Sequence, residues 1–172
     1  MIVMIYLIIQ GGMKMKIETG YLYHIKDEFF DIVNDDSLMT NHERGKCRPT
    51  YFTIRDKDIL WFIPLSSKVE KYQQIINNKI KKYGFCNTIM IENILNRKHA
   101  ILLQNAFPTL EKYIDHVHSV NGQPARVPET LEKIILNNFT RMLKLKESGT
   151  NLFFTDIDKI KKQLQEELTT AK

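Results

Sequence analysis

The clearest pattern in the sequence is a pair of β-branched and aromatic runs that a short polar turn separates. The runs are RPTYFTIRD (residues 48–56) and ILWFIPL (59–65), and Asp56, Lys57 and Asp58 form the polar segment. This arrangement predicts two antiparallel strands joined as a hairpin. Because Pro64 has no N–H to donate to a neighbouring strand, we expect the second strand to end there.

Shorter runs of the same kind predict further strands on both sides of the hairpin. They are GYLYHI (20–25), NTIMIENI (87–94), KHAILLQ (98–104) and DHVHSV (115–120). Between the first of them and the hairpin, KDEFFDIVND predicts a short helix that ends near Asn34. The polar, turn-rich stretch DDSLMTNHERGKC that follows this helix predicts a loop.

Two long segments place apolar residues three and four positions apart, which is the spacing of an amphipathic helix. The first runs from Ser67 to Tyr83 and stops before Gly84. The second starts at Pro128, a residue that suits a first helical position, and stops before Gly149. The apolar stripes are Val69, Tyr72, Ile76, Ile80 and Tyr83 in the first helix and Leu131, Ile134, Ile135, Met142 and Leu143 in the second.

A last helix closes the chain. Thr155 and Asp158 have the spacing of a capping box at its start. Its apolar stripe is Ile157, Ile160, Leu164 and Leu168. Strands gather in the first two thirds of the sequence and two helices follow them. This order predicts an α+β fold, in which helices cover an antiparallel sheet.

The composition is that of a folded protein with room for one domain. Of the 172 residues, 43% are apolar and 26% are charged, which excludes a disordered polypeptide. Cys47 and Cys86 are far apart, so a disulfide scaffold or a cysteine zinc site is poorly supported. The pair His116 and His118 would suit the start of a metal site on one strand face. No acidic or sulfur cluster completes it nearby, and we expect no metal.

Sequence motifs for common cofactors and for serine hydrolases are missing. Neither a P-loop nor a dinucleotide fingerprint occurs, so we expect no nucleotide cofactor. No G-x-S-x-G elbow is present, and the S-x-x-K motif fails because Val69 follows Ser66 and Glu70 follows Ser67 at that spacing. The net charge of +5 is compatible with an anionic partner.

The first residues form an apolar stretch, MIVMIYLIIQGG, that suits neither a membrane span nor a signal peptide. A span needs about 20 apolar residues, and a signal peptide needs a basic start and a small-residue cleavage site. We interpret residues 1–14 as a spurious extension ahead of a true start at Met15, and residues 15–172 as one domain. The alternative is an additional strand. We expect a cytoplasmic protein with no membrane association.

The segment IPLSSKVEKY (63–72) allows two interpretations. Ser67 and Glu70 have capping-box spacing, which would give Ser67 a purely structural role. A helix N-terminus also attracts phosphate, and Ser66 adds a second hydroxyl. Lys68 and Lys71 lie in the first turn, where cations oppose the helix dipole. An anion bound between these two lysines would offset that conflict.

Basic residues surround this segment. Five lysines, at positions 68, 71, 79, 81 and 82, accompany the single Glu70, and Arg97, Lys98 and His99 form a second cluster. Each of them alone fits a solvated surface residue. Together with Tyr23 and Tyr51, which we expect to be exposed on strands, they fit a groove for single-stranded RNA, in which bases stack on rings and phosphates meet lysines.

Four blocks of the sequence resemble the endoribonuclease toxins of type III toxin–antitoxin systems, the ToxN/AbiQ family, and especially its CptN-like branch. The blocks are GYLYHI, RPTYFTI, IPLSSKVEKY and LNRKHAILLQNAFP, and they cover about residues 16–148. The block with the P-L-S-S-basic motif is the most specific. The commoner family motif is P-L-[ST]-S-P-K, whereas here Lys68 follows Ser67 directly and Val69 occupies the usual lysine position.

The resemblance implies a compact, twisted antiparallel sheet surrounded by helices, similar to the Kid/MazF toxins. It also implies a phage-defence toxin that cuts mRNA and its own repetitive antitoxin RNA sequence-specifically and without a metal. The processed antitoxin RNA would bind back as an inhibitory pseudoknot, in a closed ring-like assembly of toxin and RNA. We expect the RNA 2′-OH to attack the adjacent phosphate, which leaves a 2′,3′-cyclic phosphate and a 5′-OH.

The candidate residues form two groups. The candidate catalytic residues are Ser67, Lys68, Ser66, Tyr23 and His99. The candidate RNA-binding residues are Lys71, Arg48, Tyr51, Lys79, Lys82, Arg97 and Lys98. Either Lys68 or Lys71 could supply the active-site charge, and His99 also fits a structural histidine. The rival hypotheses are a non-catalytic RNA-binding module and a protein-interaction domain with a basic surface.

Overall fold

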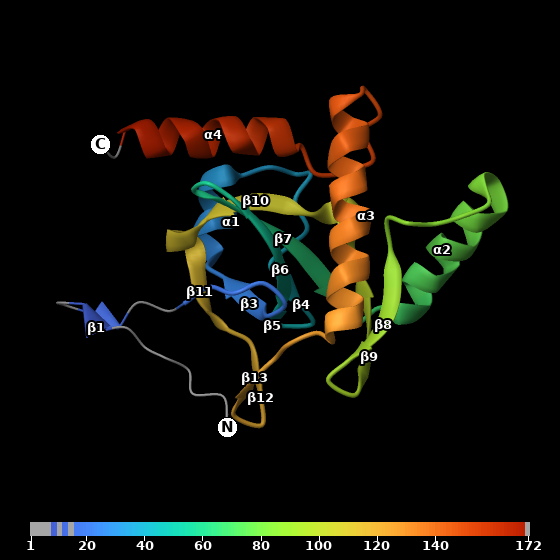
Figure 1. The fold of residues 1–172 in the computed structure, drawn as a ribbon, viewed down its shortest axis with the longest axis horizontal. Coiled ribbons are helices and arrows are strands. Elements are labelled where there is room, and N and C mark those ends of the chain that lie inside the picture. The colour runs from blue at the N-terminus through green and yellow to red at the C-terminus, as the bar shows by residue number, and fades with distance from the viewer. Residues whose placement is uncertain (1–7, 10–11, 14–15, 171–172) are drawn as a thin grey trace.

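The computed structural model describes residues 8–9, 12–13 and 16–170, and its centre is a strongly twisted antiparallel sheet (Figure 1). In the described residues, seven strands join in the order β11-β3-β6-β7-β9-β8, with β10 paired to β7. The strands are β3 (Leu22–Ile25), β6 (Thr50–Asp56), β7 (Ile59–Ser66), β8 (Met90–Ile94), β9 (Arg97–Ile101), β10 (Phe107–Leu110) and β11 (Ile114–Val117). All the strands predicted from the sequence are therefore present.

The hairpin of β6 and β7 forms as predicted, but β7 does not end at Pro64. It continues through Leu65 to Ser66, and these two residues pair with Ile101 and Ala100 of β9. Pro64 lies where the neighbour of β7 changes from β10 to β9, and its carbonyl accepts the N–H of Leu102 at 3.1 Å. In a strand, the N–H and the carbonyl of one residue point to the same side, so the N–H that Pro64 lacks would also point towards the change from β10 to β9. Its absence therefore interrupts no ladder of the sheet.

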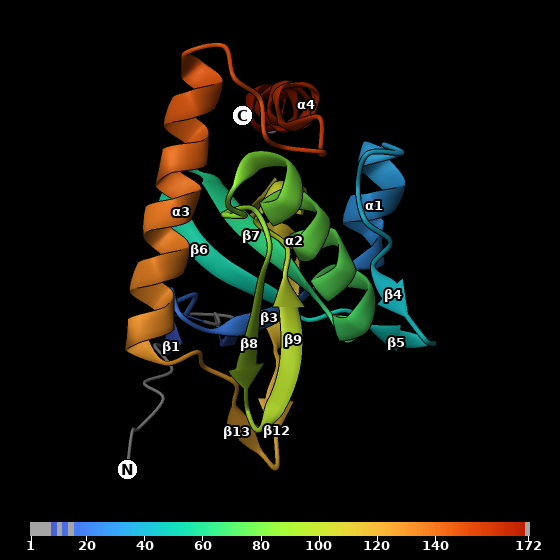
Figure 2. The same cartoon turned by 90° about the vertical axis from the view of Figure 1, so that its right-hand side faces the viewer.

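Helices cover the sheet from several sides. They are α1 (Asp27–Val33), α2 (Val69–Tyr83), α3 (Glu129–Glu147) and α4 (Ile157–Thr170). Figure 2 shows α2 and α3 on opposite sides of β8 and β9. The helix α4 packs along β10. The predicted α+β fold, with an antiparallel sheet surrounded by helices, is confirmed.

Most of the predicted helical stripes face the core. Leu131, Ile135 and Met142 of α3 are buried, and so are Ile157, Ile160 and Leu164 of α4. The stripe of α2 is buried only near its start. Tyr72 is buried, but Ile80 and Tyr83 are 46% and 58% exposed. The second half of α2 therefore extends beyond the sheet that its first half covers.

The start of α4 differs from the predicted capping box. The N–H of Lys159 donates to the carboxylate of Asp156 at 3.2 Å, so Asp156 is the capping residue. The carboxylate of Asp158 instead pairs with Lys146 of α3. The Thr155 hydroxyl is buried without a hydrogen-bond partner in the described part of the chain.

Two short hairpins lie outside the main sheet, one within a predicted loop and one where the predicted strand at 115–120 runs into a loop. The predicted loop at 35–47 contains β4 (His42–Glu43) and β5 (Lys46–Cys47), and β12 (Ser119–Val120) pairs with β13 (Gln123–Pro124). Near the N-terminus, β1 (Ile8–Ile9) pairs with β2 (Gly12–Met13). The predicted start at Met15 lies outside the described residues. None of the described helices has the length and apolar character to span a bilayer.

Candidate functional site

The segment that the sequence singles out is the junction between β7 and α2. Ser66 is the last residue of β7, Val69 is the first of α2, and Ser67 and Lys68 connect them. Ser66 pairs with Ala100 of β9. In this antiparallel register the next residues along the two strands are Ser67 and His99, so His99 of the second basic cluster is the member that follows the serine–alanine pair.

A carboxylate from the β4–β5 hairpin holds this junction in place. Glu43 accepts the hydroxyl of Ser66 at 2.8 Å and the N–H of Ser67 at 3.1 Å. It also pairs with the guanidinium of Arg48 at 3.4 Å. Burial raises the pKa of Glu43, but the hydrogen bonds from Ser67 and Ser66 and the charges of Arg48 and Lys68 outweigh it, and the pKa is lowered. Glu43 is therefore an ionised group that fixes both serines.

Arg48 lies inside the protein, where it cannot meet an RNA phosphate directly. It is 5% exposed, and its guanidinium donates to the carbonyls of Thr40 at 3.0 Å and Leu65 at 2.7 Å as well as to Glu43. A buried arginine whose donors are satisfied by carbonyls and a carboxylate is a structural anchor. The position of Arg48 does not support the predicted direct contact with RNA.

Of the two interpretations of Ser67, the capping box is wrong. Lys68, not Ser67, occupies the N-cap position of α2, and no side chain caps this helix. The Ser66 hydroxyl accepts the N–H of Lys68 at 3.2 Å, and the Ser67 hydroxyl is exposed without a hydrogen bond in the described part of the chain. Helix capping therefore does not explain why a serine stands at position 67.

The groups that the junction leaves open are donors. The hydroxyl of Ser67 and the ammonium groups of Lys68 and Lys71 are exposed, and neither lysine forms an ion pair with a described carboxylate. In the first turn of α2, the backbone N–H groups of Glu70 and Lys71 have no acceptor among the described residues. A helix N-terminus with such free donors can bind one oxyanion.

His99, the neighbour of Ala100 in β9, has one ring nitrogen free to accept a proton. Its ring is half-buried, and Nδ1 lies 3.0 Å from the carbonyl oxygen of Arg97. A carbonyl only accepts, so Nδ1 carries the proton and Nε2 of the neutral ring has a free lone pair. His99 is the one predicted proton-transfer residue that the structure leaves accessible.

Tyr23 and Tyr51 were expected to be exposed, and this expectation is wrong. They are 2% and 1% exposed, and burial raises the pKa of both phenols. Tyr23 packs edge-on against Phe52 and Phe62, and its hydroxyl bonds to the backbone of Glu18. Strand register places Tyr23 and Tyr51 on opposite faces of the sheet. Both faces of the sheet are covered at these two tyrosines. The alternation of polar and apolar residues along a strand could not reveal this.

The remaining predicted RNA-binding residues separate into two groups. Lys82, Arg97 and Lys98 are exposed, the last two at the tip of the β8–β9 hairpin. Lys79 instead donates to the Thr88 hydroxyl at 2.8 Å and to the Gln104 amide oxygen at 2.6 Å. The ammonium group of Lys79 thus ties α2 to the segments just before β8 and just after β9.

His116 of β11 and His118, which follows β11, meet a third histidine on β3. Nε2 of His24 lies 2.9 Å from Nδ1 of His118, and the His24 ring stacks on that of His116 at 4.6 Å. Burial, and then the charges of His116 and His118, lower the pKa of His24 to about 4. The described residues include no group of three histidine, cysteine or acidic side chains that could hold a metal ion.

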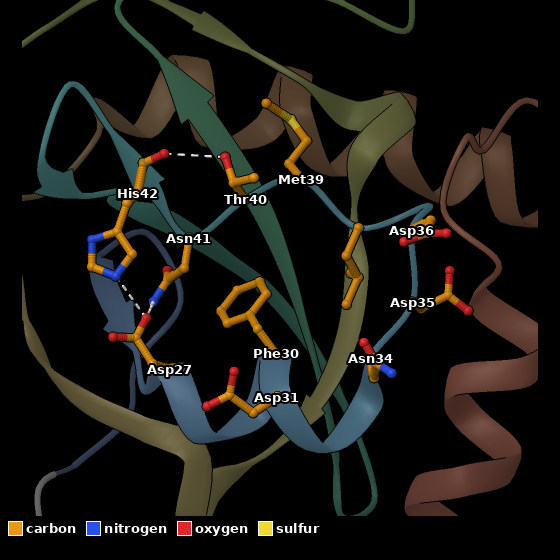
Figure 3. A pocket seen from close by; sticks show the side chains of 11 residues that line it. Asp27, Phe30, Asp31, Asn34, Asp35, Asp36, Met39, Thr40, Asn41 and His42 are labelled. Atoms are coloured by element: carbon orange, nitrogen blue, oxygen red, sulfur yellow. Dashed lines mark hydrogen bonds and ion pairs between the residues drawn. The ribbon is translucent and has the colours of Figure 1, made fainter.

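A pocket of about 620 Å³ lies beside α1 and is acidic (Figure 3). Its lining includes Asp27, Asp31, Asp35 and Asp36. The carboxylate of Asp27 is already bound by the side chains of Asn41 and His42, as Figure 3 shows. Because four carboxylates repel phosphate, this pocket is no candidate for an RNA site.

Sequence reasoning missed Glu43 and His24. Glu43 lies in a polar loop 24 residues before Ser67, and no spacing rule links the two. The sequence contained only a weak indication for His24. The predicted strand that contains it and the predicted strand that contains His116 and His118 are both short, so they could have been paired with each other. The sequence therefore identified the junction but not what supports it.

Comparison with known proteins gives a match at the level of structure. No protein-family model matches the sequence, and no curated protein does. Among solved structures, the chain resembles AbiQ, described as a lactococcal anti-phage endoribonuclease belonging to the type-III toxin-antitoxin system. The TM-score is 0.63, the match covers 90% of this chain and 98% of AbiQ, and the sequences are 12% identical. The chain thus has the same fold as AbiQ.

Proposed function

We propose that this protein is an endoribonuclease toxin of a type III toxin–antitoxin system. The observation that carries the proposal is the exposed, unpaired donor set of Ser67 and Lys68 at the junction of β7 and α2, on a fold shared with the endoribonuclease AbiQ. The P-L-S-S-basic motif lies at this junction. The motif and the fold are independent observations, and both support the same family.

The proposed reaction uses the RNA's own 2′-hydroxyl. Its oxygen forms a bond to the adjacent phosphorus while the bond from phosphorus to the 5′-oxygen breaks. Nε2 of His99 takes the proton from the 2′-hydroxyl, and water supplies a proton to the departing 5′-oxygen. The products are a 2′,3′-cyclic phosphate and a 5′-OH. The reaction needs an oriented phosphate and donors for the charge that develops on its oxygens.

The junction supplies these donors. The Ser67 hydroxyl and the free N–H groups of Glu70 and Lys71 would orient the phosphate. The Lys68 ammonium would stabilise the developing negative charge, and Lys71, one turn further along α2, is the alternative lysine. The Ser66 hydroxyl, buried and bound to Glu43, supports Ser67 from within.

The family also supplies the proposed partners and cellular role. Target mRNA and the repetitive antitoxin RNA would both be substrates, cut at a specific sequence. The processed antitoxin RNA would bind as an inhibitory pseudoknot and close a ring-like assembly with the toxin. This role in phage defence would place the protein in the cytoplasm, with residues 15–172 as the toxin domain. The proposed chemistry uses neither a metal nor a nucleotide cofactor.

The test is to induce the gene alone in bacteria beside a Ser67→Ala variant. The proposal predicts arrested growth and RNA fragments with 5′-OH ends for the unchanged protein, and neither for Ser67→Ala. Ser119→Ala, at an exposed serine of β12, is the matched control and should stay toxic. Harmless expression of the unchanged protein with intact RNA would favour a non-catalytic RNA-binding module.

A further inference from the structure

Three large aromatic rings are exposed around the second half of α2, away from the junction. Tyr83 ends α2 and Phe85 follows it, and Phe154, in the connection between α3 and α4, has its ring centre 5.6 Å from the ammonium of Lys79. Their exposed fractions are 58%, 60% and 62%. We call these three residues the ring patch. Single exposed apolar residues are ordinary, whereas several large exposed rings around one helix make a candidate binding surface.

Lys79 connects the two segments that form the ring patch. Its ammonium lies 5.6 Å from the centre of the Phe154 ring and bonds to the Gln104 side chain at 2.6 Å. The N–H of Phe154 donates to the Gln104 carbonyl at 2.7 Å. These contacts hold Phe154 beside α2, so the exposed ring is fixed and needs no ordering when a ligand arrives.

The surface around the rings is basic. Lys82 places its ammonium 4.8 Å from the centre of the Tyr83 ring, and Lys81 lies next to it on α2. Neither lysine pairs with a carboxylate among the described residues. Rings with unpaired cations suit a strand of nucleic acid, whose bases stack on the rings while its phosphates meet the ammonium groups.

Two lysines lie near the two ends of α2, one beside the junction and one beside the ring patch. Lys71 and Lys82 are 11 residues apart on α2, about three turns, so they lie on the same side of the helix. The 15 residues of α2 span about 22 Å. A stacked strand advances about 3.4 Å per nucleotide, so about six nucleotides would cover this length.

We propose that unpaired RNA next to the cut runs along α2, from the junction to the ring patch, and stacks bases on Phe85 and Phe154. This inference rests on the proposed function, since it takes the junction as the cutting site. It gives the enzyme a substrate requirement: a single-stranded segment of about six nucleotides on one side of the cleaved bond.

The test measures the affinity of the Ser67→Ala protein for fluorescently labelled oligoadenylate by anisotropy, so that the RNA stays intact. Changing Phe85 and Phe154 to Ala should weaken binding of an oligomer of about ten nucleotides about tenfold or more, as loss of stacking does. An oligomer of about three nucleotides should lose much less. Both rings are largely exposed, so the melting temperature should not change.

Ile134→Ala is the matched control, because Ile134 is an exposed apolar residue of α3 and is 48% exposed. It should bind both oligomers as the parent does. Equal affinity of the ring variant and the parent for the long oligomer would overturn the inference. So would a ring variant that changes only self-association, measured by light scattering, because the patch would then be an interface between copies.

Cleavage by the protein with Ser67 intact is measured separately on a long RNA. If this protein never cuts RNA, but the ring variant still loses affinity for the long oligomer, the proposed function fails and the RNA surface stands. If RNA is cut and both oligomers bind the ring variant normally, the proposed function stands and this inference fails.

Discussion

Glu43 connects the exposed serine of the candidate site to the protein interior. Its carboxylate is bound by the Ser66 hydroxyl, the Ser67 N–H and the buried guanidinium of Arg48. Hydrogen bonds to a charged group contribute about 1.5–3 kcal/mol each, more than neutral ones. At the scale of single residues, the position of Ser67 therefore depends on a carboxylate that touches no substrate in the proposed reaction.

Replacing Glu43 with Gln should lower both stability and cleavage. The amide has one accepting oxygen instead of two, and its NH₂ group would face a donor at Ser66, Ser67 or Arg48. We expect a loss of about 1–3 kcal/mol in the free energy of unfolding, measured with urea, and at least about tenfold slower cleavage. Glu166→Gln, at an exposed position of α4, is the control. Unchanged stability would contradict the role given to Glu43.

The two lysines near Ser67 can be ranked by substitution. Lys68 is adjacent to Ser67 and unpaired, whereas the ammonium of Lys71 lies over the Tyr72 ring, 5.6 Å from its centre. Loss of one donor to a developing oxyanion costs about 10²–10³ in kcat. We expect Lys68→Ala to approach this loss and Lys71→Ala to weaken RNA binding more than turnover, in single-turnover and binding assays. The reverse ranking would assign the catalytic role to Lys71.

At the scale of elements, the pairing of β3 with β11 creates a pH-dependent contribution to stability. His24, 8% exposed, faces His116 and His118, and the nearby carboxylate of Asp115 partly offsets their effect. The pKa of His24 falls from 6.5 to about 4, and that of His118 is lowered as well. Between these two pH values the unfolded chain binds more protons than the folded one, so stability is present above pH 6.5 and is lost as the pH falls towards 4.

His24→Gln should therefore flatten the dependence of stability on pH. The unchanged protein should lose on the order of 1–2 kcal/mol through His24 between pH 7 and pH 5, and the variant should lose less. Urea unfolding at both pH values measures the difference. Parallel losses in the two proteins would show that His24 does not titrate in this way.

The same scale explains which elements the sequence could predict. The β6–β7 hairpin and α2 follow from neighbouring residues, because strand alternation, turn residues and helical spacing are local signals. The continuation of β7 past Pro64 depends on which strand lies beside it, and the burial of Tyr51 depends on α3 covering that face of the sheet. These outcomes are decided by contacts between distant segments.

At the scale of the whole molecule, the donors of the junction and the acidic pocket beside α1 adjoin, because Glu43 binds Ser66 and Ser67 while the segment just before Glu43 lines the pocket. The candidate site follows from local sequence at Ser67, Lys68 and His99, and the roles of these residues stay predictions. It could not be predicted where distant residues define it, at Glu43. The comparison with AbiQ, at 12% identity, adds a shared fold.

The measurement that tests the central claim most directly is cleavage of RNA by the purified protein in the presence of a metal chelator, beside Ser67→Ala. The account predicts fragments that carry a 2′,3′-cyclic phosphate and a 5′-OH from the unchanged protein, and at least about a hundredfold less product from Ser67→Ala. Binding of RNA without cutting, or equal cutting by both proteins, would contradict it.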